Sequence, residues 1–180
     1  FALCATAFFI VGCAGYTKNN DTLKNVAWIT AEEGDVDVYF GLKAWRLEID
    51  SYGGSTEEWS ADSCQSRFCD RCEQDGRSAI GLLVISTVFA GVTTILSGAL
   101  ASSHNATSQL GNLFLSFVSA AFAIIAFGVF MGSCYMKIDE TSNVDLKWGA
   151  GSIITLLGLI MMFVVVVLQF GAVIVGGGSA

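Results

Sequence analysis

Long uncharged apolar runs alternate with polar stretches along this chain. Residues 79–101 form the first long run, whose 23 residues carry no charge. At 1.5 Å of rise per residue, such a helix crosses a hydrocarbon layer of about 30 Å. Residues 112–136 and 148–175 form two similar runs, and residues 1–16 form a shorter one. We interpret residues 1–16 as a truncated first transmembrane helix rather than a signal peptide. The pattern therefore predicts a bundle of four transmembrane helices.

Residues 17–78 form a large polar loop between the first two apolar runs. Residues 35–40 and 42–50 alternate polar with apolar side chains, as half-buried strands do, and Tyr52–Ser55 has the composition of a turn. A two-stranded sheet is marginal by itself, so we expect it to rest on the bundle. The predicted fold class is thus an all-α membrane protein, a four-helix bundle with a small extracellular antiparallel β-sheet in its first loop. Because the chain has no proline, we expect regular helices.

Composition and charge agree with a membrane protein. The 180 residues are 53% hydrophobic and 14% charged, with a mean hydropathy of +0.62. The loop at residues 17–78 holds most of the charges, and the net charge of −7 argues against binding to nucleic acid or to anionic lipid headgroups. The expected partners are other integral membrane proteins or further copies of the chain, within the lipid bilayer.

The predicted spans lack ionisable side chains. Gln169 and scattered serines and threonines are their main polar residues. Transport and proton paths usually need charged groups in the membrane. The sequence also has no glycine-rich phosphate loop and no Ser/His/Asp set. We therefore expect a protein that is not an enzyme and that has no cofactor, catalytic residue or metal site.

Three cysteines cluster just before the second apolar run, at Cys64, Cys69 and Cys72. A structural disulfide that holds the loop together is the favoured interpretation. The remaining thiol would stay free, bond to a partner chain, or pair with Cys134 at the end of the third run. A zinc site would need a fourth ligand. The spacing of Cys69 and Cys72 also fits a redox pair.

The cysteines and the lysines favour opposite topologies. Lys137 and Lys147 weakly favour a cytosolic position for residues 137–147. The cysteine cluster favours an oxidising compartment for the first loop, and four spans place both loops on the same side. We give the cysteines more weight. The expected location is the plasma membrane or an endomembrane, with the first loop on the extracytoplasmic side.

Glycines within the apolar runs are candidates for helix packing, because small residues let helix backbones approach closely. They would contact either a partner helix or another helix of the same bundle. The candidates are Gly91, Gly98, Gly128, Gly132 and Gly158.

The chain resembles the superfamily of claudins and peripheral myelin proteins. The similarity lies in a first span followed by a long loop of strands, in Trp28 and Gly41-Leu42-Lys43-Ala44-Trp45, in the loop cysteines, and in three closely spaced spans. It implies a left-handed four-helix bundle capped by an extracellular sheet with a loop disulfide. Members of that superfamily form junction strands, organise membranes or serve as auxiliary subunits of ion channels.

Three hypotheses for function follow. The leading one is a non-enzymatic tetraspan protein that acts as a structural or accessory subunit of a larger membrane assembly. The second is a claudin-like adhesion or barrier protein that uses its acidic loop. The third is a membrane thiol–disulfide oxidoreductase that acts through Cys69 and Cys72.

Overall fold

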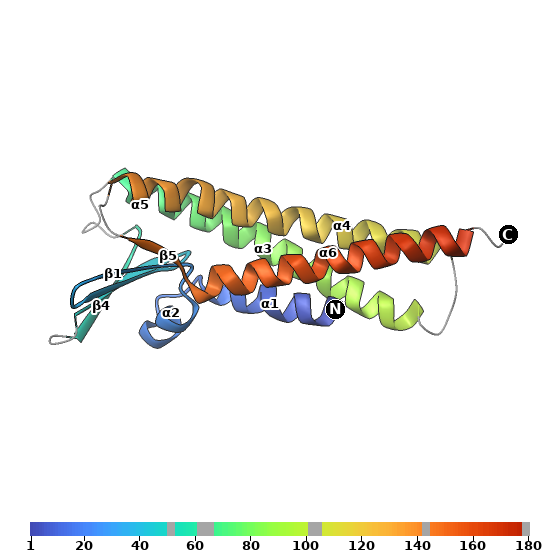
Figure 1. The fold of residues 1–180 in the computed structure, drawn as a ribbon, viewed down its shortest axis with the longest axis horizontal. Coiled ribbons are helices and arrows are strands. Elements are labelled where there is room, and N and C mark those ends of the chain that lie inside the picture. The colour runs from blue at the N-terminus through green and yellow to red at the C-terminus, as the bar shows by residue number, and fades with distance from the viewer. Residues whose placement is uncertain (50–52, 61–66, 101–105, 142–144, 178–180) are drawn as a thin grey trace.

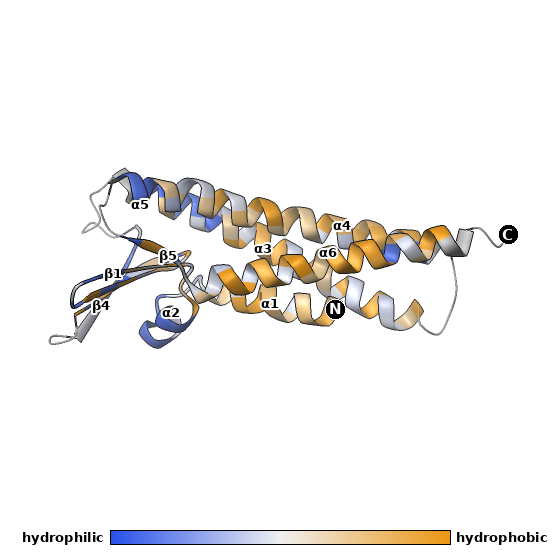
Figure 2. Ribbon diagram, in the orientation of Figure 1, coloured by the Kyte–Doolittle hydropathy of each residue, from blue (hydrophilic) through white to orange (hydrophobic). Residues whose placement is uncertain are grey.

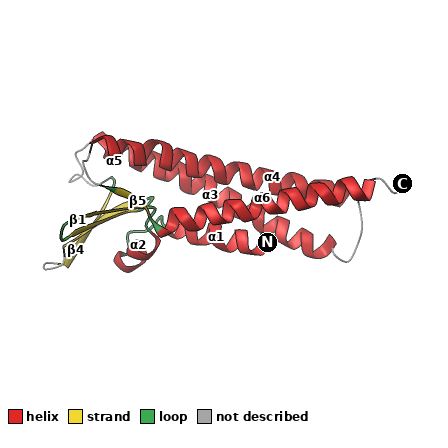
Figure 3. Cartoon of the chain, in the orientation of Figure 1, coloured by secondary structure: helices red, strands yellow, loops and turns green. Residues whose placement is uncertain are grey.

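The computed structural model of the protein describes residues 1–49, 53–60, 67–100, 106–141 and 145–177. These residues form a long helical bundle with a small sheet at one end (Figures 1 and 3). The helices are α1 (Ala2–Ala14), α2 (Asn20–Val26), α3 (Arg67–Leu100), α4 (Ala106–Val129), the π-helix η1 (Phe130–Tyr135), α5 (Met136–Thr141) and α6 (Ala150–Gly177). The strands are β1 (Ile29–Glu33), β2 (Val36–Phe40), β3 (Ala44–Ile49), β4 (Gly53–Glu58) and β5 (Leu146–Trp148).

Within the described residues, three helical stretches are long and apolar enough to cross a membrane. They are Cys69–Leu100, Ser108–Glu140 and Ala150–Ile174. Helix α1 is also apolar, but its 13 residues extend only about 20 Å, short of the roughly 20 residues that a crossing needs. Figure 2 shows that hydrophobic residues cover the bundle and that hydrophilic ones gather around the sheet, α2 and α5. Three of the four predicted spans therefore correspond to helices of spanning length.

The helices of the bundle form a ring. Helix α1 packs against α3 and α6, and α4 packs against the same two helices from the other side. Helices α3 and α4 approach closely because alanine and serine face each other between them. The hydroxyl groups of Ser86 and Ser119 each lie 2.8 Å from the other residue's backbone carbonyl. Such bonds satisfy polar groups inside a membrane bundle and hold the two helices together.

The third long helix is less regular than the absence of proline predicts. Helix α4 continues into the π-helix η1, which places Phe130, Met131 and Cys134 in the interior. A π-helix adds backbone to a turn without needing proline, and it often marks a functional position. Our expectation of regular helices throughout was therefore wrong for this segment.

The described strands form one antiparallel sheet in the order β4-β3-β2-β1-β5. Strands β2 and β3 confirm the two strands predicted from alternation. Strands β1 and β4 were not predicted, and Gly53 to Ser55, expected in a turn, belong to β4. Gly34, with a φ of 62°, forms the tight turn between β1 and β2, where glycine adopts a positive φ without strain.

The sequence predicted a sheet confined to the first loop, and this prediction is wrong because the sheet includes a strand from outside that loop. Strand β5 lies in the link before α6 and pairs with β1, with Ile29 opposite Trp148. Trp148, expected at the start of the fourth span, therefore ends a strand. Helix α6 begins at Ala150.

The polar loop also contains more helix than the sequence predicted. The stretch after Lys18 contains α2, whose N-terminus is capped by Asn19. The Asn19 side chain accepts hydrogen bonds from the backbone of Asp21 and Thr22, each at 3.1 Å. Helix α3 begins at Arg67 rather than near residue 79, so Cys69 and Cys72 lie on its first turns.

Candidate interaction surfaces

Two tryptophans are buried, of which Trp28 joins the sheet region to the bundle and Trp59 joins the end of β4 to the loop after β2. The indole N–H of Trp28 donates to the carbonyl of Gly12 in α1 at 3.1 Å, and the indole N–H of Trp59 donates to the carbonyl of Gly41 at 3.1 Å. The Trp28 ring meets Phe130 edge-on, with centroids 5.4 Å apart. Both indoles are thus buried with their one polar group satisfied. The bond from Trp28 to α1 helps to position the sheet at the end of the bundle.

The start of α6 is joined to the same region by close backbone contacts. The backbone N–H groups of Gly149 and Gly151 donate to the carbonyls of Trp28 and Ala27, at 2.9 and 2.8 Å. A Cβ on either glycine would overlap the backbone of residues 26–28. These positions therefore require glycine for the close approach of the two chain segments.

The cysteines connect α3 to η1. Cys72 forms a disulfide with Cys134 across 62 residues of sequence, and both are fully buried. This pairing was one of the alternatives left open by the sequence. Cys69 is also disulfide-bonded, and Cys64 lies outside the described residues. Because Cys72 bonds to Cys134, it does not form the redox pair with Cys69 that the spacing suggested.

A second contact adjoins this disulfide. The buried carboxylate of Asp75, one turn after Cys72, accepts a hydrogen bond from the hydroxyl of Ser133, next to Cys134. Sequence reasoning did not single out Asp75, because an acidic residue just outside an apolar run is usually solvated. The described residues contain no group of three His, Cys, Asp or Glu side chains that could hold a metal ion.

The outward face of the sheet carries a row of three carboxylates. Glu32 lies opposite Asp37, and Asp37 lies opposite Glu48, on three neighbouring strands. Residues directly opposite each other in an antiparallel sheet point to the same side, so the three side chains are adjacent. Alternation of polar and apolar residues in β2 and β3 is enough to place Asp37 and Glu48 on one face of the sheet. The third carboxylate, Glu32, could not be added because strand β1 was not predicted.

Cations neutralise the two ends of this row. Lys147 lies 2.6 Å from Glu32, and Lys24 of α2 lies 2.9 Å from Glu48. The hydrogen bond from Lys24 holds the pKa of the Glu48 carboxyl below its usual value. In the middle, Asp37 accepts a 3.4 Å hydrogen bond from the Tyr39 hydroxyl. The face is therefore acidic but partly compensated.

The five candidate glycines fall into two groups. Gly158 is buried, and a Cβ there would lie about 3 Å from Phe8 and Phe9 of α1, so it serves packing inside the bundle. At the other four positions no described atom lies within 4 Å of a Cβ. Those four, Gly91, Gly98, Gly128 and Gly132, lie on the outer faces of α3, α4 and η1.

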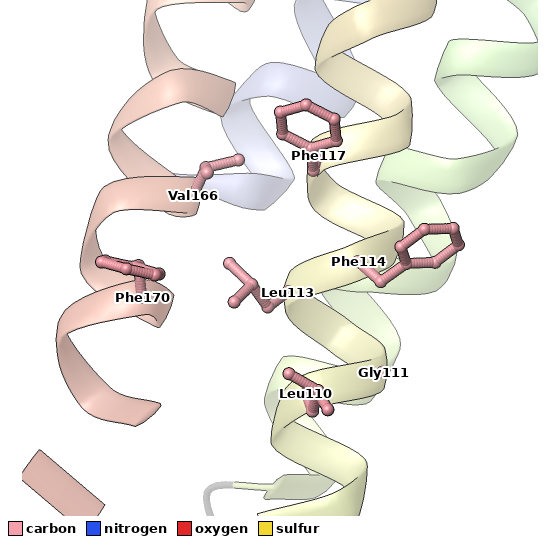
Figure 4. A pocket seen from close by; sticks show the side chains of 7 residues that line it. All are labelled: Leu110, Gly111, Leu113, Phe114, Phe117, Val166 and Phe170. Carbon is pink, nitrogen blue, oxygen red and sulfur yellow. The ribbon is translucent and has the colours of Figure 1, made fainter. Parts of the chain in front are cut away.

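A groove between α4 and α6, here called the α4–α6 groove, lies near the end of the bundle that is away from the sheet. Its volume is about 650 Å³. Figure 4 shows Leu113 of α4 pointing toward Phe170 of α6, whereas Phe114 lies on the side of α4 that is away from α6. Every lining residue is apolar: Leu110, Gly111, Leu113, Phe114, Phe117, Val166 and Phe170. No sequence pattern indicated this groove, because an apolar span has similar residues on all sides.

No protein-family model matches the chain, and no curated protein sequence matches it either. Fold and surface chemistry are therefore the basis for a functional proposal.

Proposed function

We propose that this chain is a non-enzymatic membrane protein of four spans that acts as a structural or accessory subunit of a larger membrane protein assembly. Its disulfide fits an oxidising compartment, so the sheet would face the extracytoplasmic side of the plasma membrane or of an endomembrane. The proposal includes a relationship to the superfamily of claudins and peripheral myelin proteins, which the sequence resembles.

The observation that carries this proposal is the position of the four open glycines. In a helix interior, glycine is less favourable than alanine by about 0.5–1 kcal/mol. Packing within the chain does not require glycine at these four positions, since added side chains would meet no described atom. Gly128 and Gly132, four residues apart and both exposed, leave a shallow surface of backbone. A partner helix can approach such a surface closely and gain van der Waals contact.

The test is the size of the assembly that carries this chain after extraction in a mild detergent. We expect the chain to migrate with a larger complex at fixed stoichiometry. Replacing Gly128 with Leu should release it from that complex without lowering its own thermal unfolding temperature. Gly171→Leu is a matched control, because Gly171 is also open but lies on α6. Migration of the wild-type chain as a monomer would contradict the proposal, and retention of Gly128→Leu in the complex would remove this glycine from it.

The carboxylate row favours a second candidate, adhesion or barrier formation through the sheet. Two like faces would bring acidic surfaces together, so contact between cells would need divalent cations or a basic counterpart. Aggregation of cells that display the chain should then depend on calcium and on the charge of Asp37. Aggregation that is insensitive to both would count against this candidate.

A further inference from the structure

Two polar side-chain atoms inside the bundle form no hydrogen bond with any described residue. They are the hydroxyl oxygen of Thr93 in α3 and the amide oxygen of Asn112 in α4. Thr93 has an exposed fraction of 0% and Asn112 one of 3%, so bulk solvent does not reach them from the surface. Buried polar groups are costly without a hydrogen bond, and nearly all of them have one. Both atoms therefore need a partner.

Thr93 and Asn112 occupy facing positions in the contact between α3 and α4, here called the α3–α4 seam. One layer of this seam is formed by Ser86 and Ser119, whose hydroxyl groups each donate to the other residue's backbone carbonyl. Thr93 lies seven residues after Ser86, and Asn112 lies seven residues before Ser119. Seven residues make nearly two helical turns, so the same faces of these antiparallel helices meet again about 10 Å further along.

A bond to Ser97 agrees with this register. The amide nitrogen of Asn112 donates to the hydroxyl of Ser97 at 2.9 Å. Ser97 lies four residues after Thr93, one turn further along the same face of α3. Asn112 therefore faces the turn of α3 that runs from Thr93 to Ser97.

The hydroxyl of Thr93 is not used by its own helix. The hydroxyl groups of two other threonines in α3, Thr87 and Thr94, donate to backbone carbonyls four residues earlier, at 2.7 and 2.9 Å. Thr93 forms no such bond, and it does not bond directly to Asn112 either. A water molecule is the usual bridge between facing polar groups that do not bond directly.

The charge of the surroundings favours a neutral occupant over a cation. Residues 76–138 contain no Asp or Glu, and α1 and α6 contain none either. A cation beside Thr93 and Asn112 would therefore be buried without a compensating charge, which is very costly. Water is neutral, and it can accept from a hydroxyl and donate to an amide oxygen at the same time.

We propose that the α3–α4 seam binds one internal water molecule between Thr93 and Asn112. The water accepts a hydrogen bond from the Thr93 hydroxyl and donates one to the amide oxygen of Asn112. Its second hydrogen is directed to the hydroxyl oxygen of Ser97. Three polar partners are typical of a buried water molecule. The site concerns the interior of the chain, so it does not depend on the proposed function.

The test is the transfer of magnetisation from water protons to the protein in solid-state NMR spectra. The full chain is isotopically labelled and reconstituted in phosphatidylcholine bilayers. At short transfer times, we expect the side-chain signals of Thr93 and Asn112 to be several-fold stronger than those of Ser86 and Ser119. The two serines are buried in the same seam, but they satisfy each other without water.

Variants at neighbouring threonines separate the water site from the fold. Thr93→Val removes the hydroxyl and keeps the shape of the side chain, so transfer to Asn112 should fall several-fold. Thr93→Ser keeps the hydroxyl and should keep the transfer. Thr94→Val is the matched control, because the Thr94 hydroxyl bonds to the carbonyl of Ala90, and it should leave transfer to Asn112 unchanged. The thermal unfolding temperature of each variant shows whether the bundle is intact.

Three results would overturn the proposal. Absence of transfer to Asn112 in the wild-type chain, together with a short contact between the side chains of Thr93 and Asn112, would show a direct hydrogen bond instead. Equally strong transfer to Asn112, Ser86 and Ser119 would show that the whole seam is open to solvent. Unchanged transfer to Asn112 in an intact Thr93→Val variant would show that Thr93 does not hold the water.

Discussion

At the scale of single residues, Trp28 does most to unite the two parts of the molecule. Its backbone bonds to β2 and to Gly149, and its indole bonds to α1 and packs on Phe130. The sequence suggested Trp28 only through a family resemblance, since a lone tryptophan in a polar loop has no pattern of its own. Its burial depends on segments that are far apart in the chain.

We expect Trp28→Ala to lower the free energy of unfolding by about 3–5 kcal/mol, the usual cost of removing a fully buried tryptophan. Thermal unfolding in detergent measures the change. Trp148→Ala is the control, because Trp148 is 47% exposed and should cost much less. Equal losses in the two variants would show that Trp28 is not the anchor described here.

A second prediction at this scale concerns Gly76 in α3. A Cβ at Gly76 would overlap the backbone carbonyl of Leu42, in the loop before β3. Gly76→Ala should therefore push the sheet away from α3 and lower the unfolding temperature. Gly81→Ala, five residues further along and open, should be neutral or stabilising by up to about 1 kcal/mol. A stable Gly76→Ala variant would contradict the close contact.

At the scale of elements, the sequence predicted those whose pattern is local. Alternation located β2 and β3, and uncharged length located the outer parts of α3, α4 and α6. Strand β5 has three residues and depends on its pairing with β1, so no local pattern could identify it. Helix α2 had a signal in Asn19, whose cap we did not recognise. The π-helix η1 depends on packing and on the bonds around Cys134. The spacing of hydrophobic residues along the chain carries no information about such contacts.

The carboxylate row gives a prediction about the sheet. Like charges directly opposite each other destabilise a sheet by an amount within the range of about 0.2–1 kcal/mol for cross-strand pairs. Asp37 has such a neighbour on both sides, so Asp37→Asn should raise the unfolding temperature slightly. The gain should shrink as salt is added, since salt screens exposed charges.

Glu33→Gln is the control for this experiment. Glu33 lies opposite Val36, on the other face of the sheet, so its replacement should change little. A destabilised Asp37→Asn variant would mean instead that the bond from Tyr39 or a bound cation outweighs the repulsion.

At the scale of the whole molecule, the sheet and the bundle form one folding unit. One face of the sheet is apolar and packs toward the helices, where Phe40 stacks on Trp59 with centroids 5.9 Å apart. Strand β5 arrives from the link before α6, and the disulfide joins α3 to η1. Of the surfaces described above, the sequence suggested only the one that carries the four open glycines. It could not predict the α4–α6 groove, which exists only where two helices diverge.

A separate polypeptide of residues 17–60 should therefore remain unfolded in water. It contains β1 to β4 but lacks β5, the Gly12 carbonyl that Trp28 needs, and the helices that cover the apolar face. Circular dichroism and the dispersion of amide signals in NMR spectra measure this directly. A folded fragment would show that the sheet is an independent domain.

The pairing of β1 with β5 also has a consequence for biosynthesis. The residues joined by the bond between Lys147 and Glu32 are 115 positions apart. At a translation rate of about 5–20 residues per second, the ribosome needs roughly 6 to 23 s to supply the second partner. During that time β1 has an unpaired edge while the two long hydrophobic helices α3 and α4 are synthesised. A nascent chain that stalls before residue 145 thus exposes an adhesive strand, which makes it a substrate for the chaperones of the compartment where the sheet folds.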